Sequence, residues 1–224
     1  MIEFTPIWLS LKLAFATTLV LLLVAIPLAL WLSDKRNIVK SIIEAVVSIP
    51  LVLPPTVLGF YLLQAFSPNN PIGIWLEKFL HIRLAFSFEG LLFASILYSM
   101  PFMVQPIKAG LASLPSNLKN AAYSLGKTRL QTLFKVLLPN IKPAIRTGIG
   151  LTFAHTLGEF GVVLMIGGNI PKSTRTASIA IYAEVETFHF ANANRYAAIL
   201  LIISFLLLLL LYGSNKKSHT NKFY

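Results

Sequence analysis

Five long apolar stretches constrain the fold of this chain more than any other feature of its sequence. Spanning about 30 Å of hydrocarbon takes roughly 20 helical residues at about 1.5 Å each. A chain of 224 residues that is 56% hydrophobic and 12% charged has too much apolar surface for one small soluble core. The sequence therefore predicts an all-α polytopic membrane protein with about five transmembrane helices. The stretches cover residues 7–32, 42–66, 91–107, 145–166 and 196–212.

The basic residues are distributed unevenly among the segments that connect these stretches. If the amino terminus lies outside, thirteen of the 19 Lys and Arg residues fall in inner segments and six in outer ones. The positive-inside rule then predicts an external amino terminus and a cytoplasmic carboxyl terminus. Topology accounts for the net charge of +11, and no aromatic-basic motif accompanies it, so nucleic acid is not an expected partner. The inner cations are Lys35, Arg36, Lys40, Lys108, Lys119, Lys127, Arg129, Lys135, Lys142, Arg146, Lys216, Lys217 and Lys222.

The first apolar stretch is predicted to be a retained span and not a secretory signal peptide. It begins with Glu3 and no early cation, and Trp31 stands where a small cleavage residue would be needed. The sequence contains no cysteine, which excludes disulfides, thiolate metal sites and a cysteine nucleophile. Because no internal repeat or linker is visible, we expect a single transmembrane domain over residues 1–224.

Three prolines interrupt the middle of the second stretch. Pro50, Pro54 and Pro55 remove backbone donors and clash with the preceding helical turn, so this helix is predicted to be kinked or broken. A break at membrane depth is tolerated where neighbouring protein or a water-filled cavity satisfies the freed carbonyls. Two interpretations follow. The prolines serve packing only, or Pro54, Pro55 and Thr56 line a translocation pathway.

An ionisable pair lies inside the fourth stretch. His155 and Glu159 are four residues apart, which predicts that they share one face of a helix. Ionisable groups at membrane depth are costly and are therefore functional candidates. They fit hydrogen bonding between helices or a gate; a metal site is disfavoured because two ligands are too few. Gly158 and Gly161 flank the glutamate and would permit close backbone approach.

The polar segment between the third and fourth stretches is predicted to form two short amphipathic helices. Apolar residues recur at helical spacing up to Gly126, and a capping box at Thr128 begins a second helix that ends at Pro139. Such a pair can insert the small residues Ala121 and Ala122 into a groove on a partner. Alternatively, its cations can hold it flat on anionic lipid.

This segment resembles the EAA loop of permease subunits of ABC importers. The matching pattern is Asn120-Ala-Ala, three residues, Gly126, nine residues, then Val136-Leu-Leu-Pro139, in the usual place before the penultimate span. Asn120 stands where the motif usually has glutamate, and Val136 where it usually has isoleucine. The first difference removes a carboxylate, so we expect helical docking without an ionic contact there. The resemblance assigns ATPase coupling to Asn120, Ala121, Ala122, Gly126, Val136, Leu138 and Pro139.

The resemblance extends over nearly the whole chain. Pro50-Leu-Val-Leu-Pro-Pro-Thr, Leu157-Gly-Glu-Phe-Gly161 and Asn169-Ile-Pro are similar to the molybdate-type permeases, with the sulfate permeases close behind. The resemblance implies a type I ABC importer (MetI-like) permease fold in a bacterial cytoplasmic (inner) membrane, with a coupling loop at about residues 113–140. The implied partners are a second copy of the chain, two copies of an ABC ATPase subunit, an extracytoplasmic oxyanion-binding protein and the lipid bilayer.

Neither an enzymatic activity nor a cofactor or metal is expected for this chain. It contains no Gly-x-x-x-x-Gly-Lys-Ser/Thr loop, so ATP would be hydrolysed on a separate subunit. The expected function is translocation of molybdate, with tungstate or sulfate as the alternative substrate. A more distant alternative is an ion-gradient-driven transporter in which His155 and Glu159 relay protons. The candidate pathway and gate residues are Pro54, Pro55, Thr56, His155, Gly158, Glu159 and Gly161.

Two smaller expectations concern anions. A dianionic substrate makes a bare carboxylate unfavourable, so Glu159 is predicted to be paired or protonated and not a ligand. The outer loop of residues 167–176 contains glycines, hydroxyls and two cations. This loop either contacts an oxyanion or serves only as a connector.

Overall fold

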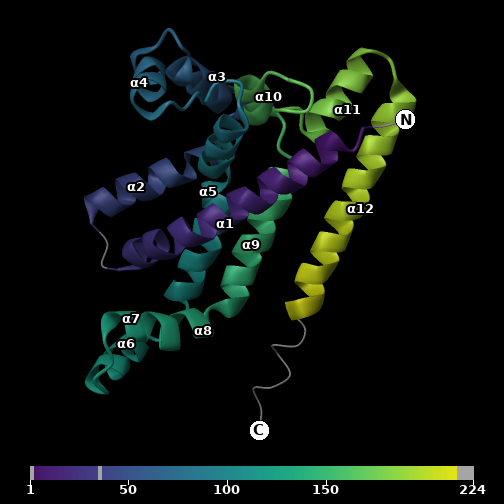
Figure 1. Ribbon diagram of the computed structural model, residues 1–224. Helices are drawn as coiled ribbons and strands as arrows, with labels where there is room; N and C mark the ends of the chain where they lie inside the picture. Colours follow the sequence, from purple (N-terminus) through teal and green to yellow (C-terminus); the bar gives the residue numbers. More distant parts are fainter. Residues whose placement is uncertain (1–2, 35–36, 216–224) are drawn as a thin grey trace.

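The computed structural model describes residues 3–34 and 37–215, and every regular element within these ranges is a helix (Figure 1). The inner cations Lys35, Arg36, Lys216, Lys217 and Lys222 lie outside the described residues. The elements are α1 (Thr5–Ser33), α2 (Ile38–Ser48), the 3-10 turn η1 (Ile49–Leu51), α3 (Pro55–Phe66), α4 (Pro71–Leu80), α5 (Phe88–Ala112), α6 (Ser116–Ser124), α7 (Arg129–Thr132), the π-helical turn η2 (Leu133–Leu137), α8 (Leu138–Asn140), α9 (Lys142–Leu157), α10 (Gly161–Gly167), α11 (Ala177–Glu186) and α12 (Phe190–Asn215).

Three described helices are long and apolar enough to cross a membrane without interruption, namely α1, α5 and α12. Two further candidates are bent pairs. The pair formed by α2–η1 and α3 bends by 110°, and the pair formed by α9 and α10 bends by 56°. The predicted number of five spans is reached only if each bent pair is one span.

The position of each proline explains why one helix breaks and another does not. Val52 to Pro54 separate η1 from α3, and Pro55 occupies the first turn of α3, where a missing N–H costs little. The predicted interruption of the second stretch is therefore confirmed. In contrast, Pro101 and Pro106 lie inside α5, which continues as one helix from Phe88 to Ala112.

The helices α1, α5 and α9 pack against one another and form the centre of the molecule. Small residues bring them close. An added Cβ at Gly110 of α5 would lie 2.5 Å from the Cβ of Ala144 on α9, and one at Gly148 would lie 3.1 Å from the sulfur of Met103. Close approach through small residues is the usual way that membrane helices associate, because the apolar drive between them is weak.

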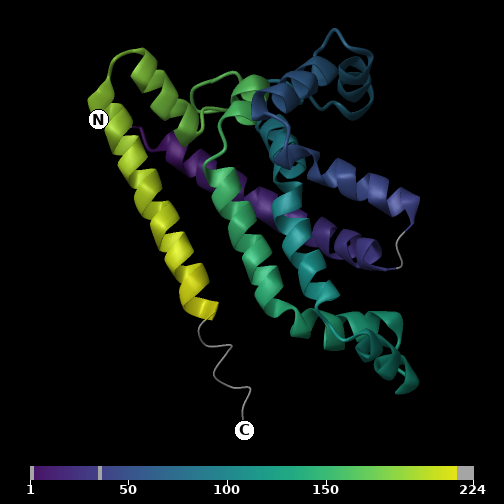
Figure 2. The same ribbon diagram turned by 180° about the vertical axis from the view of Figure 1, so that it is seen from behind.

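Polar and loop segments gather at two opposite ends of the molecule. The start of α1, together with α4, α10 and α11, lies at one end, and α6 to α8 with the end of α12 lie at the other (Figures 1 and 2). An odd number of crossings places the two chain ends on opposite sides. This arrangement therefore agrees with five spans in which the polar segment of residues 113–140 shares a side with the carboxyl-terminal end of α12.

Candidate functional site

The segment of residues 113–140, called the coupling segment below, contains the predicted turn at glycine. Gly126 has φ +75°, the left-handed conformation that glycine adopts without strain. Around it, the N–H of Lys127 donates to the carbonyl of Ala122, and the N–H of Gly126 donates to that of Tyr123. These two bonds form a Schellman motif that ends α6. The predicted capping box at Thr128 is also confirmed, because Thr128 and Gln131 exchange both hydrogen bonds.

The second helix of the coupling segment ends within one residue of the predicted Pro139. The helix runs from α7 through the π turn η2 into α8 and ends at Asn140. A π turn shifts the hydrogen-bond register by one residue, and Pro139 follows this shift as the second residue of α8. Val136 lies in the π turn, and its carbonyl accepts a hydrogen bond from the Asn140 side chain at 2.7 Å.

The predicted small-residue face of α6 is only partly available to a partner. Ala122 is buried, because α6 packs on this side against α7 and η2 of the same segment. Ala121 stays exposed on the neighbouring side, so the two alanines do not present one surface. The exposed residues of the coupling segment that suit a protein contact, called the docking face below, are Asn120, Ala121, Leu125, Leu130 and Phe134.

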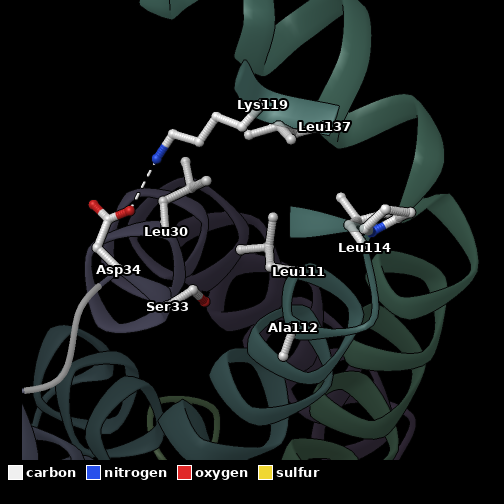
Figure 3. A pocket seen from close by; sticks show the side chains of 9 residues that line it. Leu30, Ser33, Asp34, Leu111, Ala112, Leu114, Lys119 and Leu137 are labelled. Carbon is white, nitrogen blue, oxygen red and sulfur yellow. Dashed lines mark hydrogen bonds and ion pairs between the residues drawn. The ribbon is translucent and has the colours of Figure 1, made fainter. Parts of the chain in front are cut away.

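An ion pair joins the coupling segment to the end of α1, and a cavity lies between the segment and the helices α1 and α5 (Figure 3). The Nζ of Lys119 on α6 lies 2.9 Å from Oδ1 of Asp34, just after α1. Below this pair, a cavity of about 260 Å³ is lined by residues that include Leu30 of α1, Leu111 of α5 and Leu137. Both partners of the ion pair are partly exposed, so it contributes little to stability. It links α6 to the end of α1.

The two helix breaks meet in space. An added Cβ at Gly161, the first residue of α10, would lie 3.0 Å from the Cβ of Pro55 and 3.3 Å from the backbone nitrogen of Thr56. The structure thus brings Pro55, Thr56 and Gly161 together, as expected for residues of one site. Pro54 is exposed beside them. Gly158 does not join this contact, since an added Cβ there would meet only the preceding turn of its own helix, 3.8 Å away.

The expectation that His155 and Glu159 share one helix face is wrong. The helix α9 ends at Leu157, and Glu159 lies in the break before α10, so the four-residue spacing does not stack the two side chains. His155 instead packs against α5. Its Nδ1 lies 2.9 Å from the Ser99 hydroxyl, and its ring stacks on Phe102 with centroids 4.0 Å apart. This geometry corresponds to the hydrogen-bonding interpretation of His155.

Glu159 is buried without a hydrogen-bond partner. The residue is 5% exposed, and neither carboxyl oxygen makes a hydrogen bond with another described residue. The Ser95 hydroxyl of α5 lies beside the carboxyl group but is also unpaired. The backbone of Glu159 is held more firmly, because Ser178 on α11 donates to its carbonyl at 2.6 Å. No basic residue neutralises this carboxyl group within residues 3–34 and 37–215.

Thr174 and Arg175 of the outer loop make hydrogen bonds that hold its shape. Thr174 is buried; it donates to the carbonyl of Gly167 at 2.6 Å and accepts from the N–H of Ile170 at 3.0 Å. Arg175 donates to the side chain of Asn169 at 2.7 Å. These contacts favour the connector interpretation over contact with an oxyanion.

Sequence reasoning missed the serines of α5. Ser95 and Ser99 are four residues apart and fully buried, so they share the face of α5 that meets α9 and the break after it. The spacing of two hydroxyls within an apolar stretch was the available signal. Asp34 was missed for a different reason, because its partner Lys119 is 85 residues away in the sequence.

Replacing Ser99 by alanine is expected to destabilise the bundle. Its hydroxyl contacts both His155 Nδ1 and Thr156 Oγ1 at 2.9 Å, so its loss leaves two polar groups without a partner between α5 and α9. Hydrogen bonds between membrane helices contribute about 1 kcal/mol each, and we expect a loss of about 1–2 kcal/mol. Thermal unfolding of the purified protein in detergent measures it. Ser113→Ala, an exposed serine that bonds within its own helix, is the control, and equal stability of the two variants would contradict the assignment.

Comparison with known proteins identifies the family. Residues 14–216 match the family described as "Binding-protein-dependent transport system inner membrane component". The chain belongs to this family of ABC importer permeases. A permease of this family is a non-catalytic membrane subunit, and the ATPase is a separate subunit.

Several curated permeases are similar to this chain. It is 46% identical over 215 residues to the molybdenum transport system permease protein ModB of Azotobacter vinelandii, covering 96% of this chain and 95% of that one. It is 36% identical to the sulfate transport system permease protein CysT of Escherichia coli, covering 75% of this chain and 60% of that one. It is 35% identical to ModB of Haemophilus influenzae, covering 92% of this chain and 91% of the relative.

Solved ABC transporters share the fold. The MetNI methionine transporter in an inward-facing conformation gives a TM-score of 0.72, with 16% identity, 95% of this chain and 94% of that chain covered. A bacterial alginate transporter, solved with a periplasmic protein bound to an alginate pentasaccharide, gives 0.78, with 17% identity, 96% of this chain and 79% of that chain covered. The permease thus has the MetI-like type I importer fold that its sequence predicts.

Proposed function

We propose that this permease carries molybdate across the cytoplasmic membrane, driven by ATP hydrolysis on a separate subunit. The observation that carries the proposal is its 46% identity to a molybdenum permease over nearly the full length of both chains. The 36% identity to a sulfate permease makes sulfate the alternative substrate. Molybdate, sulfate and tungstate are all tetrahedral dianions, so the same pathway suits each of them.

The docking face is the proposed contact with the ATPase. Leu125 is 79% exposed, and Leu130 and Phe134 are exposed close by in the sequence, which is costly for apolar groups unless a partner covers them. The ion pair at the end of α1 and the packing of Leu138 against the core formed by α1 and α5 support a role as a rigid lever. Closure of two ATPase subunits would move the lever and rock the spans between inward-open and outward-open states.

A second copy of the chain is the proposed partner within the membrane. The break between η1 and α3 exposes apolar residues at membrane depth, with Val52 88% exposed and Leu51 beside it also exposed. Broken helices in a bilayer need a protein or a water-filled path beside them. We place Pro54 and Thr56, which are exposed at the same break, along this path at the homodimer axis, where an extracytoplasmic binding protein delivers the oxyanion.

A competition experiment tests the substrate. Cells that lack their own molybdate and sulfate importers would express this permease with the ATPase and binding protein encoded beside it. Uptake of radioactive molybdate should resist a hundredfold excess of sulfate and be abolished by excess unlabelled molybdate. If sulfate inhibits molybdate uptake efficiently and is itself taken up, the substrate of this permease is sulfate instead. Cells that express the permease and the ATPase without the binding protein are the control for leakage.

A charge placed on the docking face is expected to release the ATPase. Leu125→Glu leaves the fold unchanged, because the side chain is exposed, but it puts a carboxylate into the proposed apolar contact at a cost of about 1–3 kcal/mol. Co-purification of the ATPase in detergent should fall by about tenfold or more. The control neutralises Lys127, Arg129 and Lys135 to glutamine, which would weaken contact with anionic lipid but leave the apolar contact. If the control loses the ATPase and Leu125→Glu retains it, the cations and not the apolar residues bind the ATPase.

A further inference from the structure

An apolar groove lies between α9 and α12, and the membrane-length part of α12 is largely exposed beside it. The upper part of α12 is fixed to α1 and α11 through a cluster that includes Tyr196 and Ile7. Lower down, α12 runs beside α9 (Figures 1 and 2). A groove of about 440 Å³ lies between their side chains. Its walls consist of apolar residues and a glycine, and they include Leu11, Ile149, Phe153, Ile203, Leu207 and Leu210.

Two cations lie at the end of this groove that is nearest the coupling segment. Arg146 precedes Ile149, Gly150 and Phe153 by three, four and seven residues, so it lies on the same face of α9 as the groove wall. Lys142 lies one further turn down the same face. One turn is about 5 Å, so the guanidinium stands just beyond the apolar wall. Both side chains are exposed.

Within residues 3–34 and 37–215, no carboxylate pairs with either of these cations. The acidic residues described at this end of the molecule are Asp34 and Glu44, which are paired with Lys119 and Lys108 respectively. A second copy of the chain would bring the same paired acids and the same cations. An apolar groove that ends in two cations with no acidic partner among the described residues complements a lipid with an anionic head group.

We propose that this groove binds one anionic phospholipid, with an acyl chain between α9 and α12 and the phosphate on Arg146 and Lys142. Occupation of the groove fills the space between the two helices over about 10 Å of α12, from Ile203 to Leu210. The lipid thereby couples the position of α12 to the start of α9, where the coupling segment joins the spans. The site is independent of the substrate that the permease carries.

Native mass spectrometry of the full chain in a neutral detergent tests the proposal. The probes are phosphatidylglycerol and phosphatidylcholine with identical acyl chains. The wild type should retain phosphatidylglycerol in preference, at one molecule per chain. Arg146→Gln should lower this retention about fivefold, in line with the contribution of one cation near a membrane surface. Leu207→Trp, which fills the groove, should lower the retention of both lipids.

Matched controls separate this site from lipid that simply surrounds the protein. Lys172→Gln removes an exposed cation from the outer loop of residues 167–176, and Leu208→Trp adds an indole on α12 outside the groove; both should behave as the wild type. Equal retention of the two lipids, or no effect of Arg146→Gln, would overturn the proposal. So would loss of self-association in Leu207→Trp with phosphatidylglycerol retained, because a second copy of the chain would then occupy the groove.

Discussion

Gly161→Val is expected to abolish transport by forcing the two helix breaks apart. A Cβ at this position already lies 3.0 Å from the ring of Pro55 and 3.3 Å from the backbone of Thr56, and neither atom belongs to a flexible side chain that could move aside. Overpacking of this kind costs about 1–3 kcal/mol. Because both breaks lie on the proposed pathway, we expect molybdate uptake to fall by about tenfold or more, with Gly161→Ala intermediate.

The control for Gly161→Ala is Gly158→Ala in the same break. Gly158 has φ −91°, which any residue adopts, and an added Cβ there meets nothing closer than its own helix. This variant should transport as the wild type does. Uptake is normalised to the amount of permease in the membrane, and the apparent Tm is measured beside it. Normal uptake and stability for Gly161→Val would show that the two breaks do not meet as described.

Glu159→Lys is expected to prevent stable assembly, whereas Glu159→Gln should retain transport within about twofold. A lysine here would place a permanent charge at a buried position within the membrane, which costs about 3 kcal/mol or more. Glutamine keeps the shape of the side chain without a charge. If the carboxyl group is protonated and structural, as its burial without a basic partner implies, the neutral amide replaces it.

The Glu159→Gln variant also separates the proposed importer from an ion-gradient-driven transporter. A proton relay needs a group that gains and releases a proton, which glutamine cannot do. Uptake is therefore measured for Glu159→Gln across a range of external pH, with Ser95→Ala as a companion because Ser95 lies beside the carboxyl group. Loss of uptake in Glu159→Gln with a normal amount of folded protein would favour the relay.

The apolar stretches and prolines of the sequence predicted most of the fold. Membrane-length stretches located α1, α5 and α12, and Pro50, Pro54 and Pro55 predicted the interruption that separates α2 and η1 from α3. The coupling segment was equally predictable at its centre. A glycine at the end of an amphipathic helix and a capping box after it are local signals, and both determine backbone hydrogen bonds that involve only neighbouring residues.

Features that depend on tertiary packing were not predictable from local patterns. Helical spacing placed Ala121 and Ala122 on one face, but the fold of the segment onto itself buries only Ala122. Helical spacing also predicted that His155 and Glu159 share one face. However, α9 ends between them because the chain turns by 56° into α10. No local sequence pattern predicted that turn. Gly158 and Gly161 permit it, and packing of α10 against α3 and α5 selects it.

We expect this permease to move molybdate only when a partner hydrolyses ATP. The most direct measurement is uptake of radioactive molybdate into proteoliposomes that contain the permease, its ATPase and its binding protein. We predict uptake that requires ATP, stops when the ATPase carries a substitution in its phosphate-binding lysine, and persists when an ionophore collapses the proton gradient. Uptake that continues with the inactive ATPase and disappears with the ionophore would contradict the account.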